Sequence, residues 1–135
     1  MRAKLTLAAV AVVLAAIPVA AHHNTVAEYD ASATVTLKGV VTRVDWSNPH
    51  VYIYIDAKDE TGKVVNWRTE GYPPNTLTRA GFTRDIVSVG DNVTINGFRA
   101  RDNTASVAAH ELTTPDGRKF KFGAEALGDK WKLIL

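Results

Sequence analysis

The sequence contains no cysteine, and this absence excludes several kinds of chemistry. Disulfide bonds, thiolate metal ligands and the lipid-modified cysteine of a bacterial lipoprotein are all ruled out. Common catalytic signatures are missing too: we find no Gly-x-Ser-x-Gly, no His-Glu-x-x-His and no glycine-rich phosphate loop. The carboxylates of Asp45, Asp56, Glu70 and Asp85 are present, but no spacing marks two of them as a pair. We therefore expect a protein that is not an enzyme.

The first 21 residues have the layout of a secretory signal peptide. Arg2 and Lys4 precede an apolar run that ends in the small residues Val19-Ala20-Ala21. Cleavage after Ala21 would make His22 the first residue of the mature chain. The alternatives are cleavage after Ala20 and an uncleaved membrane anchor. We expect an exported protein, periplasmic or secreted from a bacterium, with no stable membrane span after cleavage.

The mature chain lacks an excess of charge of either sign. Setting aside Arg2 and Lys4 lowers the number of basic residues from 16 to 14, which equals the 14 acidic residues. Nucleic-acid-binding domains usually carry a basic surface. A neutral, exported chain therefore predicts no nucleic acid partner.

Runs rich in β-branched and aromatic residues predict a succession of strands. These strands are expected at residues 35–46, 51–57, 64–70, 92–100 and 105–113, with a short last strand after the turn at 115–117. Gly39 marks a bend or bulge in the first strand. Pro73 and Pro74 interrupt the pattern, and a short helix is expected over 76–80, with Asn75 as its N-cap and Gly81 closing it.

The order of these elements predicts an all-β protein. A small OB-like Greek-key β-barrel of five to six strands places one short helix between strands 3 and 4. Another small β-barrel or a sandwich is the alternative. The predicted organisation is a signal peptide at 1–21, an N-terminal arm at 22–34, the barrel at 35–122 and a C-terminal tail at 123–135.

The chain has four histidines, and two of them, His22 and His23, stand at the predicted mature N-terminus. With His22 first, its α-amine and imidazole can chelate one metal ion, and His50 or His23 can supply a third nitrogen. Nitrogen-rich, near-planar geometry suits Cu(II), so copper is the candidate cofactor. Cleavage after Ala20 would instead place His23 third, which favours Cu(II) or Ni(II). The alternative is an exposed arm, with His50 capping its turn through a backbone hydrogen bond.

Aromatic residues form a second candidate site. Tyr52 and Tyr54 share one face of a predicted strand, and Trp46 and Trp67 lie on its expected neighbours. OB barrels bind ligands on strands 2 and 3 and in the loop between strands 1 and 2, which here contains Asn48. These rings could stack on a sugar or a small ligand. Alternatively, they cover the core of the barrel itself.

Several stretches together resemble a family of small exported bacterial proteins catalogued as a domain of unknown function (family 6152). They are "AHHNTVAEYD", "VTLKGVVTRVDWSNPHVYIYIDAKDETGKVVNW", "PNTLTRAGFTRD", "GDNVTINGFRARD" and "LTTPDGRKF". The segment before the helix, "GYPPN", departs from the Gly-Ser-Pro-Asn type usual in the family. The resemblance implies an exported, periplasmic, single-domain protein and carries no activity.

We therefore expect a non-catalytic binding module, with copper as the candidate ligand of His22, His23 and His50. One alternative is a structural or protein-interaction domain with a partner in the cell envelope. The other is a binder of carbohydrates or small ligands through Trp46, Asn48, Tyr52, Tyr54 and Trp67.

The processing site gives the first testable prediction. Secretion of the full chain should yield a mature protein whose N-terminal peptide has the mass of a segment that starts at His22. Mass spectrometry of the digested protein measures this directly. A peptide that starts at Ala21, or one that retains the apolar run, would exclude an N-terminal His22 amine.

Overall fold

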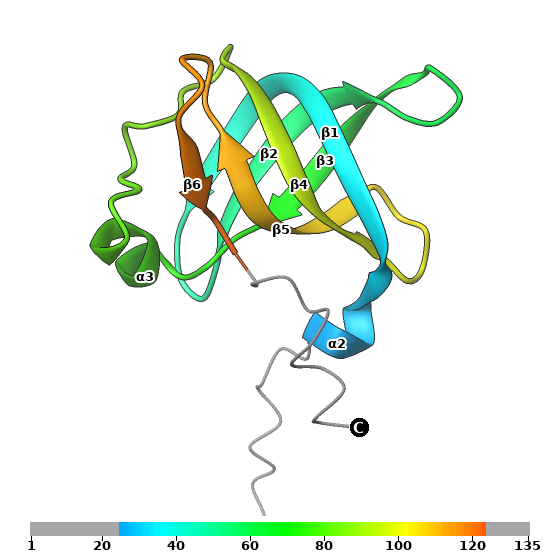
Figure 1. Ribbon diagram of the computed structural model, residues 1–135, viewed down its shortest axis with the longest axis horizontal. Coiled ribbons are helices and arrows are strands. Elements are labelled where there is room, and N and C mark those ends of the chain that lie inside the picture. Colours follow the sequence, from blue (N-terminus) through cyan, green and yellow to red (C-terminus); the bar gives the residue numbers. More distant parts are fainter. Residues whose placement is uncertain (1–24, 124–135) are drawn as a thin grey trace, which may run out of the picture.

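A computed structural model describes residues 25–123 (Figure 1). Its elements, in chain order, are α2 (Thr25–Glu28), β1 (Tyr29–Trp46), β2 (Val51–Lys58), β3 (Val64–Glu70), α3 (Pro74–Arg79), β4 (Asn92–Ala100), β5 (Ser106–Thr113) and β6 (Lys119–Lys121). Neither helix in this part of the chain is long and apolar enough to cross a membrane. The predicted signal peptide and most of the predicted tail lie outside the described residues.

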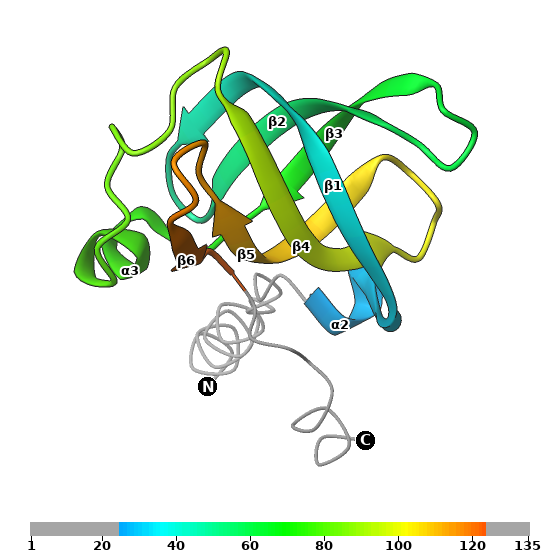
Figure 2. The same cartoon turned by 45° about the horizontal axis from the view of Figure 1, so that its top comes forward.

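The six strands form one sheet that closes on itself, as Figures 1 and 2 show from two directions. The strand order is β3-β2-β1-β4-β5-β6, and these neighbours pair antiparallel. A parallel pairing between β3 and β5 closes the ring at Arg68 to Glu70. With the single helix α3 between β3 and β4, this is the predicted OB-like barrel.

Strand β1 is long because it belongs to both halves of the barrel. Its first part pairs with β4 and its second part with β2, and Gly39 pairs on both sides, with Val93 and Ala57. A Cβ atom at Gly39 would lie 2.2 Å from the carbonyl oxygen of Asp56. The predicted glycine position is therefore one of close backbone approach, and the register shift that marks a bulge falls between Val41 and Arg43.

The N-terminal boundary of β1 differs from the prediction. The strand begins at Tyr29, six residues before the expected Val35, so most of the expected arm at 22–34 is β-structure or the short helix α2. The early part of the strand pairs with β4. Its sequence lacks the β-branched alternation that marked the later strands, and tertiary pairing with β4 decides its conformation.

The barrel interior is filled by the alternating faces of its strands. In β2, Val51, Ile53, Ile55 and Ala57 are buried, while the side chains between them are half-buried or exposed. This is the predicted period of two. Other strands contribute further core residues: Leu37, Val41, Trp67, Val93, Ile95, Val107, Ala109 and Leu112.

Helix α3 spans six residues and begins two residues before the predicted start at residue 76. Pro73 occupies the cap position without a side-chain hydrogen bond, and Asn75 lies inside the helix. The predicted closure by Gly81 is confirmed: its φ is +87°, and the amides of Gly81 and Phe82 donate to the carbonyls of Thr78 and Leu77. Leu77 and Phe82 are both buried in the core, so this cap fixes α3 against the barrel.

Gly39 should be less replaceable than a glycine whose conformation alone is unusual. Gly39→Ala forces a methyl group into the backbone of β2 and should lower the free energy of unfolding by about 3 kcal/mol. Gly81→Ala, which meets no atom within 4 Å but must keep a positive φ, should cost about 1 kcal/mol. Urea denaturation of the two variants checks this order, and equal losses would contradict the steric argument.

Candidate functional site

His50 lies at the start of β2 and contacts the end of β3. Its Nδ1 atom is 2.8 Å from the carbonyl oxygen of Gly71 and 3.6 Å from Oε1 of Glu70. A carbonyl oxygen only accepts hydrogen bonds, so Nδ1 carries the hydrogen and donates it. Nε2 is then the ring nitrogen with the lone pair. The carbonyl of Gly71 thus selects the tautomer of His50; the bond is to backbone, as the capping alternative expected, but to the residue after β3 and not to the turn that contains His50.

Glu70 is the charged centre of a buried polar cluster. It is only 5% exposed, and its Oε2 accepts a 2.7 Å hydrogen bond from the hydroxyl of Tyr29. A glutamate is almost never buried unless it has a partner. The cluster joins His50 to Glu70 and Glu70 to Tyr29, and so connects the turn after β1, the end of β3 and the start of β1.

Tyr29 extends the cluster to β5. Its side chain is 1% exposed, and its hydroxyl lies 3.2 Å from Oγ of Ser106. Arg68 in turn donates from Nε to the same Ser106 oxygen at 3.3 Å. Burial raises the pKa of Tyr29 well above its ordinary value, and the neighbouring carboxylate of Glu70 raises it further. The phenol is therefore a hydrogen-bond donor throughout the physiological range.

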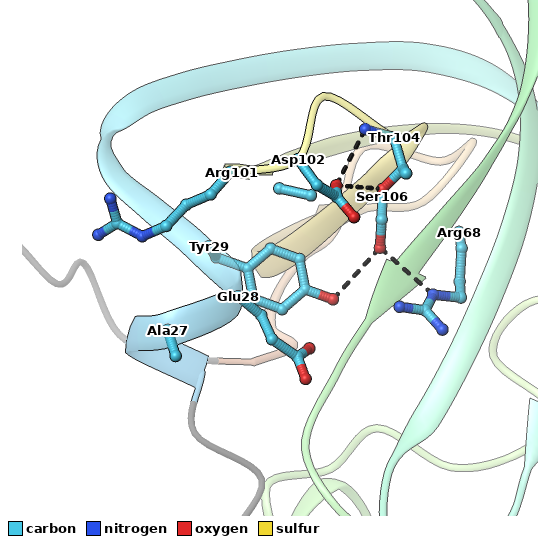
Figure 3. Close-up of a pocket in the computed structure, with 9 residues that line it drawn as sticks. Ala27, Glu28, Tyr29, Arg68, Arg101, Asp102, Thr104 and Ser106 are labelled. Carbon is cyan, nitrogen blue, oxygen red and sulfur yellow. Dashed lines mark hydrogen bonds between the residues drawn. The ribbon is translucent and has the colours of Figure 1, made fainter.

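A pocket of about 410 Å³ lies beside this cluster (Figure 3). The walls come from α2, the first residue of β1, the strand β3, the end of β4, the start of β5 and the loop between them: Ala27, Glu28, Tyr29, Arg68, Ala100, Arg101, Asp102, Thr104 and Ser106. Hydrogen bonds from the hydroxyl and amide of Thr104 lower the pKa of Asp102. OB barrels take ligands near this loop, so the pocket has the position expected of a ligand site.

The aromatic residues singled out in the sequence do not share one surface. Trp67 is 2% exposed and belongs to the core, because its side of β3 faces the barrel interior. Trp46 is half-buried and stacks on Phe82 with ring centroids 6.1 Å apart. Both tryptophans thus pack as the core alternative predicts.

Tyr52 and Tyr54 are half-buried on the opposite, outer face of β2. The guanidinium of Arg68 lies 5.2 Å from the ring centre of Tyr52, and that of Arg43 lies 4.8 Å from the ring centre of Tyr54. Asn48 is exposed in the turn before His50. A stacking surface for a ligand would therefore comprise the two tyrosines and their arginines, without the tryptophans.

The metal-ligand prediction falls partly outside the described residues. His22 and His23 precede Thr25, where the description of the chain begins. Within residues 25–123, no group of three or more histidine, cysteine, aspartate or glutamate side chains could hold a metal ion. Of the three predicted ligands, the structure positions His50 alone.

A family model matches residues 9–109, which is most of the chain. The protein belongs to DUF6152, a family of unknown function. Neither a search of the curated proteins nor a search of the solved structures finds a match to this chain. The segment that matches DUF6152 contains Tyr29, His50, Glu70 and Ser106 and runs into β5.

Sequence reasoning missed most of the cluster found in this DUF6152 protein. Tyr29 fell in the expected arm, Ser106 was an ordinary strand residue, and Glu70 was one of several carboxylates without an assigned partner. The available signal was the position of Glu70, which directly follows the inward-facing Thr69 and precedes Gly71 at the end of a strand. A hydrogen-bonding partner for it could be found only in the folded structure.

Removing the Tyr29 hydroxyl should weaken the barrel and change its response to alkali. Tyr29→Phe leaves Oε2 of Glu70 without its donor and should lower the free energy of unfolding by about 1–3 kcal/mol at pH 7. The raised pKa of Tyr29 stabilises the native state fully below the unfolded value near 10, and this contribution decreases as pH rises above about 10. Tyr29→Phe should therefore lose less stability between pH 9 and 11 than the wild type does, as urea denaturation would measure.

Tyr54→Phe is the matched control, because Tyr54 lies on the outer face of β2. It should keep the alkaline sensitivity of the wild type. An unchanged alkaline slope in Tyr29→Phe would show that another group dominates the loss of stability at high pH.

Proposed function

We propose that the protein is an exported, non-catalytic binding module that holds one copper ion through its N-terminal histidines and His50. In this proposal the signal peptide is removed before His22 and the mature protein acts in the periplasm. The α-amine and imidazole of His22 chelate the ion, and the imidazole of His50 completes a site with three nitrogen ligands. His23 is the replacement for His22 if cleavage falls one residue earlier.

The hydrogen bond from His50 Nδ1 to Gly71 is the observation that carries this proposal. Histidines that bind metals usually donate their other ring hydrogen to a backbone carbonyl or a carboxylate. That hydrogen bond fixes the tautomer, and it leaves the lone pair on Nε2, the ring nitrogen that does not contact the backbone carbonyl. His50 has such a partner in Gly71, and the carboxylate of Glu70 lies nearby.

The path of the chain also supports a site at this end of the barrel. Tyr29 binds Glu70, and Glu70 lies beside His50, so the start of β1 belongs to the same corner as His50. The helix α2, which directly precedes Tyr29, begins at Thr25. Three extended residues can span about 10 Å, so the segment from His22 to Asn24 is long enough to act as a short tether.

Copper is the metal that the proposed ligands favour. Imidazole and amine nitrogens bind Cu(II) more tightly than they bind the other common divalent ions. The near-planar arrangement of these nitrogens also suits Cu(II). The chain has no cysteine, so no thiolate ligand is present that would favour a softer metal ion. Glu70 has the place of an outer-shell carboxylate that holds the imidazole and adds negative charge close to the cation.

A binder of small ligands is a second candidate, and the outer face of β2 is the observation that favours it. On that face, the guanidinium of Arg68 lies over the ring of Tyr52, and the guanidinium of Arg43 lies over the ring of Tyr54. The faces of strands 2 and 3 are the usual ligand surface of an OB barrel. If an added oligosaccharide protects these two tyrosines from chemical modification in the absence of metal, the result would favour this candidate over copper.

Titration of the processed protein with Cu(II) tests the proposal. We expect one ion per chain, an EPR signal of nitrogen-coordinated copper and a dissociation constant below about 1 μM. Glu70→Gln should weaken binding by about 10–100-fold through loss of outer-shell support, and His50→Ala should weaken it further. Circular dichroism verifies that each variant is folded.

Two controls make the result specific. A chain with one additional methionine before His22 keeps every side chain but loses the amine of His22, and it should bind as weakly as His22→Ala. His110→Gln, which changes a histidine that stacks on Phe98 and is not a proposed ligand, should bind like the wild type. Failure of the processed protein to bind stoichiometric copper would reject the metal site.

A further inference from the structure

A second cavity, of about 330 Å³, lies where β1 and β4 meet the hairpin between β2 and β3. It shares no lining residue with the pocket at Tyr29 and has a mixed apolar and charged wall: Thr34, Val35, Thr36, Leu37, Lys58, Asp59, Glu60, Trp67 and Arg99. Its volume is within the usual range for small-molecule sites, and the mouths of β-barrels are common places for them. The cavity therefore has the size and position of a ligand site.

Two residues that line this cavity each carry a side-chain hydrogen-bond donor without an acceptor in the described part of the chain. Trp67 Nε1 and Arg99 Nε are both buried, and neither has a partner among the residues that the structure describes. The guanidinium of Arg99 lies 5.3 Å from the centre of the Trp67 ring, so the two donor-bearing groups are neighbours. Buried N–H groups nearly always have a partner, and two unpaired donors side by side call for an explanation such as a missing ligand.

The charges around the cavity indicate the kind of acceptor that would fit. Nη1 of Arg99 contacts Oε1 of Glu60 at 3.3 Å, but the Glu60 side chain is 88% exposed, and such ion pairs are weak. Asp59 is engaged within its own turn, where its Oδ1 accepts from the hydroxyl and amide of Thr61 and the amide of Lys63. The buried Nε edge of Arg99 is thus left to match an external planar oxyanion.

We propose that this cavity binds a small carboxylate, which accepts hydrogen bonds from Nε of Arg99 and Nε1 of Trp67. The carboxylate provides two oxygens in one plane, and a guanidinium pairs with that geometry better than with a point charge. Lys58 on the wall adds a second positive charge, while Asp59 and Glu60 are like-charged neighbours that weaken binding. This site is independent of the proposed copper site.

The indole hydrogen of Trp67 allows a direct test. Succinate is titrated into the folded, 15N-labelled mature protein, and the indole signal of Trp67 is followed after its assignment with Trp67→Phe. We expect a saturable downfield shift, because the N–H group gains an oxyanion acceptor. Succinamide, which has the same carbon skeleton without the charge, should cause no saturable shift, and neither should sodium chloride at matched ionic strength.

Two substitutions identify the partners. Arg99→Lys keeps the positive charge but loses the planar fork, and it should weaken succinate binding by about tenfold or more. Glu60→Gln, at an exposed position, should strengthen binding by about twofold to fivefold because it removes a repelling carboxylate. Arg118→Gln, which changes an exposed ion pair in the hairpin between β5 and β6, should leave binding unchanged.

The proposal is overturned if succinate causes no saturable shift of the Trp67 indole, which would leave buried water as the partner of these donors. It is also overturned if succinamide or chloride reproduces the shift, or if Arg99→Lys and Arg118→Gln bind succinate equally well. Thermal unfolding of each variant verifies that any lost binding does not arise from a lost fold.

Discussion

The barrel depends on a single backbone contact in the middle of β1. Gly39 is paired with β2 on one side and β4 on the other, and the carbonyl of Asp56 occupies the space that a side chain would need. Because the strand is continuous through this point, the sheet can curve until β3 reaches β5. That closure brings Tyr29 beside Glu70, 41 residues further along the chain, and beside Ser106, 77 residues further along. The polar cluster is therefore a product of the barrel's topology.

Strands with one buried face could be predicted because apolar residues recur at every second position along them. Val51, Ile53 and Ile55 show that period, and β4 has the bounds that its sequence indicated. The start of β1 could not be predicted in this way. Its residues between Tyr29 and Val35 are small or polar and mostly exposed or half-buried, so they carry no apolar alternation. Their strand conformation comes from pairing with β4, which is a tertiary effect.

The candidate site was less predictable than the fold. Local turn chemistry singled out His50, because a histidine after Pro49 at the start of a strand has a restricted direction. The partners of His50 are set by long-range packing: Glu70 and Gly71 come from the end of β3, and Tyr29 comes from a segment with no strand signal. The aromatic set mixed two faces of the sheet. Trp67 pairs with the inward-facing Ile55, whereas Tyr54 pairs with Arg68 on the outside.

The pocket at Tyr29 and the cavity at Trp67 differ in how well their polar groups are paired, and this difference separates their proposed roles. At the Tyr29 end, the hydroxyl of Tyr29 binds both the carboxylate of Glu70 and the hydroxyl of Ser106, so these groups are held in fixed positions. A paired, buried network of this kind is suited to supporting a ligand-binding group such as His50 from behind. At the Trp67 end, two adjacent donors have no acceptor in the described part of the chain, and this costs free energy in the unliganded fold. A ligand recovers that free energy only if it brings an acceptor into direct contact with them. The first end is thus arranged to position a binding residue, and the second to contact its ligand itself.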